Sequence, residues 1–124
     1  MTVRVLIVDD QPPFREAART VVELTDGFEV AGEVETGEDA VTSARELDPD
    51  LVLMDVNLPG INGLEATKQI LAESDRVVIL VLSTYEAAEY APRVAETGAA
   101  AYIPKADFGP EKLSEAWEAA TAGR

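Results

Sequence analysis

The chain has 124 residues, 47% of them hydrophobic and 27% charged, which is the balance of one soluble globular domain and excludes a disordered or fibrous protein. It contains no cysteine and no histidine, which excludes disulfides, thiol nucleophiles and thiolate or imidazole metal ligands. Its 24 acidic and 10 basic residues give a net charge of −14, which excludes DNA binding by this chain alone and disfavours anionic membrane surfaces.

Short apolar runs alternate with longer amphipathic stretches, which is typical of repeated βα units. Strands are predicted at residues 3–8, 28–34, 51–54, 77–82 and 101–103. Helices are predicted at residues 13–24, 37–47 and 63–73, within 86–97, and at 110–122. Strands joined by single helices run parallel, with right-handed crossovers. The predicted fold is therefore a single α/β domain over residues 1–124, a flavodoxin-like, doubly wound, three-layer (βα)5 arrangement of five strands in the order 2-1-3-4-5.

Several helices carry start and stop signals. Thr36 is expected to cap the second helix, with Asp39 three residues on, and Gly98 to end the fourth. Pro92 falls within the fourth helical stretch. A proline inside a helix costs about 3 kcal/mol, whereas one in the first turn costs little. We therefore predict that the regular helix begins late, with Pro92 in its first turn and residues 86–90 as a loop.

Polar side chains follow the strands where each one ends. Asp9 and Asp10 follow the first strand, Asp55 the third, Ser83 the fourth and Lys105 the fifth. The carboxyl ends of parallel strands share one edge of the sheet, which is where sites form in doubly wound folds. In the predicted order the first and third strands are neighbours about 5 Å apart, so that Asp10 and Asp55 can share one cation.

This set of residues has a definite chemistry. Three carboxylates in a partly buried crevice repel one another unless they are protonated or share a cation. Oxygen ligands without thiolate or imidazole favour Mg²⁺, with Mn²⁺ as the alternative. Asp55 can act as a carboxylate nucleophile, while Ser83 and Lys105 can contact the oxygens of a phosphoryl group. The pattern predicts an aspartyl-phosphate site.

The same residues lie in four motifs, which are Val8-Asp9-Asp10, the run DVNLPGINGLE at residues 55–65, Leu82-Ser83-Thr84 and Tyr102-Ile103-Pro104-Lys105. With these motifs in this order and spacing, essentially the whole chain resembles the receiver domain of two-component response regulators. The resemblance implies that Asp55 accepts a phosphoryl group from the phosphohistidine of a cognate sensor histidine kinase. It also implies that Mg²⁺ is held by Asp10, Asp55 and the backbone carbonyl of Asn57, with Asp9 acting through water.

The resemblance also assigns a switch. It implies that Lys105 is the phosphate-binding ammonium, that Ser83 is the switch hydroxyl and that Tyr102 turns inward when Ser83 moves. Ala106 stands where many receivers have a proline after a cis bond, so the isomer of the Lys105–Ala106 bond stays open. The implied protein is no enzyme beyond its own phosphotransfer and dephosphorylation.

Residues 80–86 and 98–102 resemble most the subclass that has a LuxR-type helix-turn-helix output domain. We therefore expect this receiver to belong to a longer transcription regulator, which would contact DNA only through a C-terminal domain. The alternative is a stand-alone receiver that acts in a phosphorelay or by binding a protein. Whether phosphorylation drives homodimerisation stays open. The surfaces that the family suggests are the first and last helices, or the fourth helix with the last strand and helix.

Two other classes share parts of this pattern. A phosphohydrolase of the haloacid dehalogenase type has its nucleophile after the first strand and a second Asp two residues on, where this chain has Asp9-Asp10-Gln11. A flavodoxin-like cofactor carrier needs a Gly- or Ser/Thr-rich phosphate loop there, where this chain has two prolines. Because no apolar run approaches the roughly 20 residues of a membrane span, we expect a cytoplasmic protein without a membrane partner.

Overall fold

The computed structural model describes residues 2–84 and 91–123. In these residues the strands β1 (Val3–Val8), β2 (Phe28–Val34), β3 (Leu51–Asp55), β4 (Val78–Ser83) and β5 (Ala101–Pro104) form one parallel sheet in the order β2-β1-β3-β4-β5. The helices are α1 (Pro12–Leu24), α2 (Gly37–Leu47), α3 (Gly63–Glu73), α4 (Ala91–Glu96) and α5 (Pro110–Thr121), with a short 3-10 helix, η2 (Lys105–Asp107). The predicted fold class and strand order are confirmed.

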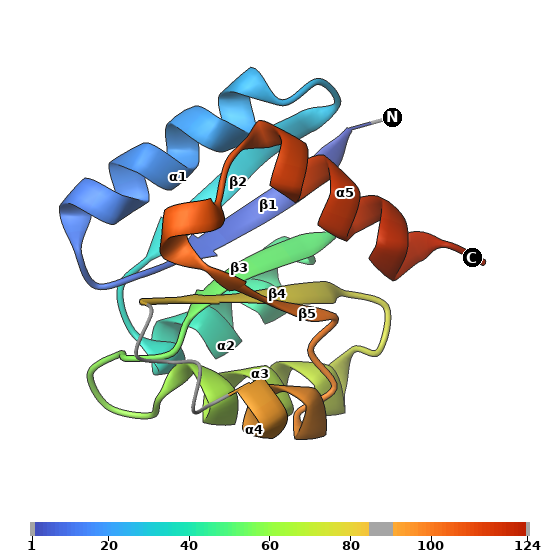
Figure 1. Cartoon of the computed structure of the whole chain (residues 1–124). Coiled ribbons are helices and arrows are strands. Elements are labelled where there is room, and N and C mark those ends of the chain that lie inside the picture. Colours follow the sequence, from blue (N-terminus) through green and yellow to red (C-terminus); the bar gives the residue numbers. More distant parts are fainter. Residues whose placement is uncertain (1, 85–90, 124) are drawn as a thin grey trace.

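Helices cover both faces of the sheet, with α1 and α5 on one side and α2, α3 and α4 on the other (Figure 1). Alternate strand residues therefore enter two separate cores, and the strands read as continuous apolar runs because both faces are buried. The core under α1 and α5 contains Val5, Ile7, Leu51, Leu53, Leu80, Leu82 and Leu113. The opposite core contains Leu6, Val8, Val52, Met54, Ile79, Val81 and Ile70.

The predicted cap of α2 and the glycine that ends α4 are confirmed. The Asp39 N–H donates to the Thr36 hydroxyl oxygen at 3.0 Å, which caps α2. Gly98 follows α4 with a φ of +91°, a value that an L side chain rarely adopts. Pro92 is the second residue of α4 within the bounds Ala91–Glu96, whereas the predicted loop at residues 86–90 lies outside the described residues.

The element ends differ from the predictions by a residue or two. Asp55 and Ser83 are the last residues of β3 and β4, because their backbones stay in the ladder, and β4 begins at Val78. The described peptide bonds are all trans, including the bond between Lys105 and Ala106 whose isomer the sequence left open. The differences leave every predicted element in place.

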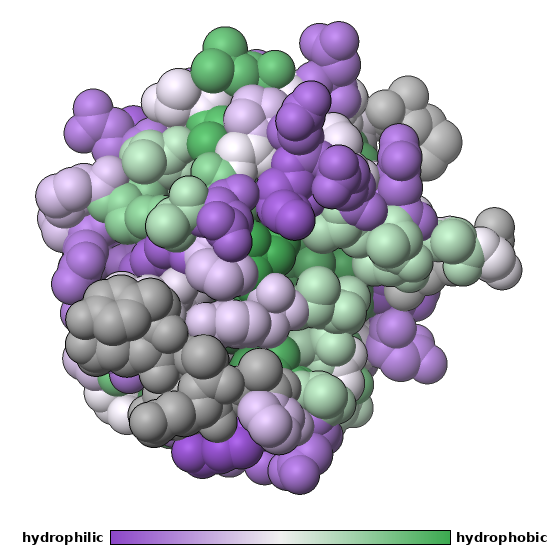
Figure 2. All heavy atoms as spheres, in the orientation of Figure 1, coloured by the Kyte–Doolittle hydropathy of each residue, from purple (hydrophilic) through white to green (hydrophobic). Residues whose placement is uncertain are grey.

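Hydrophilic residues cover much of the face seen in Figure 2, with smaller hydrophobic areas between them. Leu24 is the exposed large hydrophobic residue among those the structure describes. None of the described helices has the length and apolar character that crossing a membrane requires.

Candidate functional site

The strand register brings the predicted residues to one edge of the sheet. Val8 pairs with Met54, so the next residues, Asp9 and Asp55, lie at the same level on neighbouring strands. Ser83 ends β4 one strand further, and Lys105 directly follows β5 as the first residue of η2. The parallel sheet thus gathers these side chains from segments far apart in the sequence, as predicted.

The centre of the site is an acidic cluster formed by Asp9, Asp10 and Asp55. Carboxylate oxygens of the three residues lie within 4.8 Å of one another, which is close enough to ligate one ion. Asp9 is 1% and Asp55 4% exposed, whereas Asp10 is open to solvent. The cluster is therefore buried on one side and accessible on the other. It offers only hard oxygen donors, which fits a divalent cation such as Mg²⁺.

Lys105 is the cation of the site. Its Nζ donates to Asp9 Oδ2 at 2.7 Å and lies 3.5 Å from Asp55 Oδ1. The same ammonium lies 4.4 Å from the centre of the Phe14 ring, at the distance of a cation–π contact. With its side chain only 13% exposed, Lys105 is held between two carboxylates and an aromatic face.

The surroundings disfavour a charged Asp55. Burial, together with the neighbouring Asp9 carboxylate, raises the pKa of Asp55 from 3.8 to about 6, and Lys105 opposes that rise. The repulsion expected from the sequence is therefore present in the folded chain. An added positive charge would relieve it, which is a second reason why the residues fit a divalent cation.

Ser83 has a buried hydroxyl. Its Oγ has no hydrogen-bond partner among the described residues, and the residue is 0% exposed. Leaving a buried polar group unpaired costs roughly 1–3 kcal/mol. A buried hydroxyl without a partner at this edge of the sheet is a group that an oxygen atom of an incoming ligand could satisfy.

Tyr102 and Asn57 are the two remaining residues to which the sequence analysis gave a role. Tyr102 is half-buried against the core under α3 and α4, and its hydroxyl donates to the Thr84 carbonyl at 3.3 Å. Asn57 is exposed at the start of the loop between β3 and α3. The Gly63 N–H donates to the Val56 carbonyl at 2.9 Å, which folds that loop back against the end of β3.

Gly63 lets α3 begin directly against the nucleophile candidate. A Cβ at this position would collide with the backbone carbonyl of Asp55. The Asn62 side chain caps the same helix by accepting a hydrogen bond from the Glu65 N–H at 2.9 Å. A glycine is therefore required here by packing.

Sequence reasoning missed three residues around Asp9. The Gln11 N–H donates to Asp9 Oδ1 at 2.9 Å, and an Arg15 N–H donates to the Asp9 carbonyl at 2.8 Å. The third is Phe14, beneath Lys105. Their position in the sequence could have indicated them, because all three lie in the segment that directly follows the acidic pair and begins α1.

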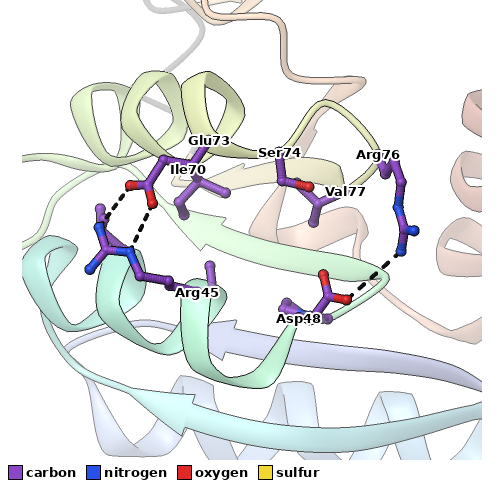
Figure 3. Close-up of a pocket in the computed structure, with 10 residues that line it drawn as sticks. Arg45, Asp48, Ile70, Glu73, Ser74, Arg76 and Val77 are labelled. Carbon is purple, nitrogen blue, oxygen red and sulfur yellow. Dashed lines mark hydrogen bonds and ion pairs between the residues drawn. The ribbon is translucent and has the colours of Figure 1, made fainter.

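A cavity of about 340 Å³ lies elsewhere, between α2 and α3 (Figure 3). An ion pair from Arg45 Nε to Glu73 Oε1 at 2.8 Å crosses one end, and Asp48 and Arg76 lie at the other. Asp48 precedes β3 and Arg76 precedes β4, so the cavity lies toward the amino ends of the strands. It shares no lining residue with the acidic cluster.

Comparisons with known proteins agree with this geometry. The model of the response regulator receiver domain matches residues 5–118. The transcriptional regulatory protein DegU of Brevibacillus brevis is 35% identical over 121 residues, which are 98% of this chain and 51% of DegU. The response regulator GacA of Pseudomonas aeruginosa is 37% identical over 122 residues, 98% of this chain and 56% of GacA. The chain spans about half the length of these curated relatives.

Solved structures share the fold. A LuxR-family two-component response regulator from Aurantimonas sp. SI85-9A1 superposes with a TM-score of 0.88 at 36% identity, covering 100% of this chain and 88% of that one. The response regulator domain of Thermotoga maritima CheB superposes with a TM-score of 0.87 at 28% identity, covering 100% of both chains.

Proposed function

The chain belongs to the response regulator receiver domain family, with LuxR-family proteins among its relatives, and on that premise we propose that it takes a phosphoryl group from a sensor histidine kinase onto Asp55. The observation that carries the proposal is the position of Asp55. Its carboxylate is nearly buried, shares a cluster with Asp9 and Asp10, and lies 3.5 Å from the Lys105 ammonium.

The reaction needs a nucleophile and charge neutralisation. A carboxylate oxygen of Asp55 would attack the phosphorus atom, and an O–P bond would form. The N–P bond of the kinase's phosphohistidine would break, with its electron pair returning to the imidazole nitrogen. A pKa of about 6 leaves Asp55 mainly ionised at neutral pH, so the nucleophile is ready without a general base.

Receiver domains bind Mg²⁺ through an aspartate cluster, and this chain has such a cluster. In the proposal, Asp10, Asp55 and the backbone carbonyl of Asn57 ligate the ion, with Mn²⁺ as a substitute, and Asp9 acts through water. Bound there, the ion would supply positive charge against the phosphoryl oxygens.

Lys105 and Ser83 would bind the oxygens of the phosphoryl group on Asp55. Lys105, now paired with Asp9 at 2.7 Å, would also contact a phosphoryl oxygen, and the unpaired Ser83 hydroxyl would donate to another. Tyr102, whose hydroxyl now reaches the Thr84 carbonyl, would turn inward as Ser83 moves. In the proposed switch a phosphoryl oxygen therefore competes with Asp9 for Lys105 and gives the Ser83 hydroxyl the partner that it lacks.

The output that we propose is control of transcription, exerted through a C-terminal DNA-binding domain. Its support is that the relatives of about twice this length include a transcriptional regulatory protein. A similar solved structure is a response regulator of the LuxR family. A net charge of −14 assigns any DNA contact to such a further domain. A cytoplasmic location and homodimerisation on phosphorylation belong to this proposal. A stand-alone receiver in a phosphorelay, acting on a protein target, is the alternative.

Intact-mass spectrometry with acetyl phosphate tests the phosphoacceptor. The wild-type chain should gain one phosphoryl group when Mg²⁺ is present and none in excess chelator. Asp55→Asn, which keeps the size and removes the nucleophile, should gain none. Undiminished labelling of Asp55→Asn, or equal labelling in chelator, would overturn the assignment.

A further inference from the structure

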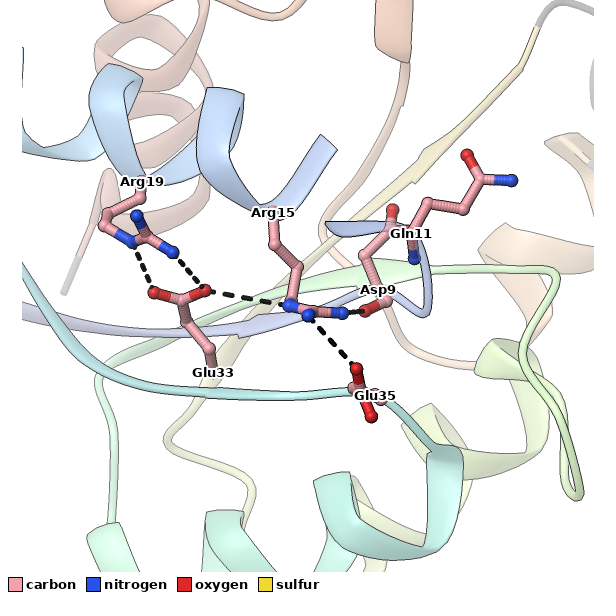
Figure 4. Close-up of polar contacts among 6 residues, drawn as sticks. All are labelled: Asp9, Gln11, Arg15, Arg19, Glu33 and Glu35. Carbon is pink, nitrogen blue, oxygen red and sulfur yellow. Dashed lines mark hydrogen bonds and ion pairs between the residues drawn. The ribbon is translucent and has the colours of Figure 1, made fainter. Parts of the chain in front are cut away.

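Arg15 links three elements beside the acidic cluster. It lies in the first turns of α1, and its side chain is only 16% exposed. One guanidinium N–H donates to the backbone carbonyl of Asp9 at 2.8 Å, while Nη2 lies 3.1 Å from Glu35 Oε1 and Nε lies 3.8 Å from Glu33 Oε1. Figure 4 shows the guanidinium lying between the two glutamates of the β2 side and Asp9. The end of β1 is thereby tied to the end of β2 through α1.

The carbonyl that Arg15 contacts belongs to the peptide between Asp9 and Asp10. Because a peptide is planar, holding its oxygen also fixes the direction of the Asp10 N–H and limits where the Asp10 side chain can lie. On the other side of Asp9, the backbone N–H donates to the Val34 carbonyl at 3.1 Å. The contact from Arg15 therefore holds the backbone of Asp9 one residue beyond the last pair of β1 and β2.

Arg19 provides an internal comparison, one turn further along α1. It donates two hydrogen bonds to Glu33, at 2.6 and 3.1 Å, and its side chain is 43% exposed (Figure 4). Arg19 and Arg15 therefore share Glu33 as a partner. The hydrogen bonds from Arg19 go to Glu33, whereas Arg15 also contacts Asp9. Removing Arg19 breaks an ion pair of the same network and leaves the contact between Arg15 and Asp9 in place.

We propose that Arg15 is a positioning residue, which orients the Asp9–Asp10 peptide and so prearranges the carboxylates of the acidic cluster for a divalent cation. The inference rests on the proposed function in that the cation is the one required for phosphotransfer. Glu35 and Glu33 act one step further out by holding the guanidinium. The planar fork of arginine suits this place because one side chain bonds a carbonyl and a carboxylate at once, which a lysine ammonium does less well.

Removing the Arg15 guanidinium should lower the affinity for Mg²⁺ and leave the rate of phosphoryl transfer at saturating Mg²⁺ nearly unchanged. Partners that orient metal ligands typically contribute about 10- to 100-fold to affinity. Arg15→Ala should therefore weaken Mg²⁺ binding by about tenfold or more. At saturating Mg²⁺ the maximal rate of labelling by acetyl phosphate should stay close to that of the wild type. Arg15→Lys should show an intermediate loss, and Arg19→Ala should bind Mg²⁺ like the wild type.

The experiment uses the whole chain of 124 residues and two readouts. Mg²⁺ affinity is measured by isothermal titration calorimetry. In the metal-free protein, amide hydrogen exchange is measured at Gln11, whose N–H donates to Asp9 Oδ1 at 2.9 Å. Exchange at Gln11 should be faster in Arg15→Ala and unchanged in Arg19→Ala. If Arg15→Ala does not fold, Arg15→Lys decides the comparison, because it keeps the length and charge of the side chain.

The outcomes separate this inference from the proposed function. Wild-type affinity and wild-type Gln11 exchange in the Arg15 variants would overturn the positioning role. An equal loss in Arg19→Ala would also overturn it, because the cause would then be general weakening of the network. If the wild-type chain binds no Mg²⁺, the proposed function fails. The Gln11 exchange of the metal-free variants then still decides whether Arg15 holds the Asp9–Asp10 peptide.

Discussion

The Lys105 ammonium donates a 2.7 Å hydrogen bond to Asp9 although 96 positions separate the two residues in the chain. The bond joins the first residue of η2 to the residue that follows β1, and Lys105 also lies 3.5 Å from Asp55 Oδ1. Lys105 thus partly neutralises the acidic cluster. A side chain that binds two of the three carboxylates is placed to sense any change of charge among them.

The first prediction concerns that neutralisation. Lys105 lowers the pKa of Asp55, which burial and Asp9 together raise to about 6. Lys105→Ala should therefore raise the Asp55 pKa further in the metal-free protein, which carboxyl carbon NMR titration measures. Lys112→Ala, which removes an exposed lysine of α5, is the matched control and should leave that pKa unchanged. An Asp55 pKa that falls in Lys105→Ala would contradict the electrostatic account of the site.

The second prediction concerns stability against pH. A carboxyl whose pKa rises from 3.8 to about 6 on folding binds its proton more tightly in the folded chain. It therefore lowers stability above pH 6, and this cost disappears as the pH falls below 3.8. Asp55→Asn should raise the free energy of unfolding at pH 7 by about 1–3 kcal/mol. Urea denaturation should show that gain shrinking toward zero in acid.

The matched control for this gain is Asp75→Asn in the exposed loop before β4, which should change stability little at either pH. A gain in Asp55→Asn that persists unchanged at pH 3 would mean that its origin is packing. Mg²⁺ should stabilise the wild-type chain more than Asp55→Asn, because a ligand stabilises the folded state that binds it.

The third prediction concerns the unpaired hydroxyl of Ser83. Because this buried Oγ has no described partner, Ser83→Ala should keep or raise the free energy of unfolding, by up to about 1 kcal/mol. Thr67→Val is the contrasting variant, because the Thr67 hydroxyl donates to the Gly63 carbonyl at 2.7 Å. It should cost about 1 kcal/mol. Chemical denaturation compares the two, and a clear loss of stability in Ser83→Ala would show that its hydroxyl is satisfied.

The fourth prediction concerns the approach of α3 to β3. Gly63→Ala places a methyl group into the Asp55 carbonyl and against the Cα atom of Val56. All of these are backbone atoms, which cannot move aside at low energetic cost. It should cost about 1–3 kcal/mol and slow the labelling of Asp55. Gly109→Ala is the control, because a Cβ there meets nothing within 4 Å, and it should leave labelling unchanged. Normal labelling of a stably folded Gly63→Ala would contradict the packing argument.

The fold and the place of the acidic cluster could be predicted from the amino-acid sequence. Apolar runs at β1, β3 and β4 and turn residues between them predict parallel strands, since local pattern reflects which faces are buried. The shared carboxyl edge then follows from parallel pairing, which is why Asp9, Asp55 and Lys105 were expected together. The switch roles of Ser83 and Tyr102 came instead from the resemblance to a family, because the residue types and their spacing indicate no conformational switch.

Other features were decided only in three dimensions. The bond from Lys105 to Asp9, the contact of Arg15 with the Asp9 carbonyl and the unpaired Ser83 hydroxyl depend on strand register and on which rotamers the packed neighbours allow. Hydrophobic periodicity records the face on which a residue lies, and it carries no information about which polar atom meets which. Such pairings arise from distances and burial that exist only once the sheet and its helices have packed together.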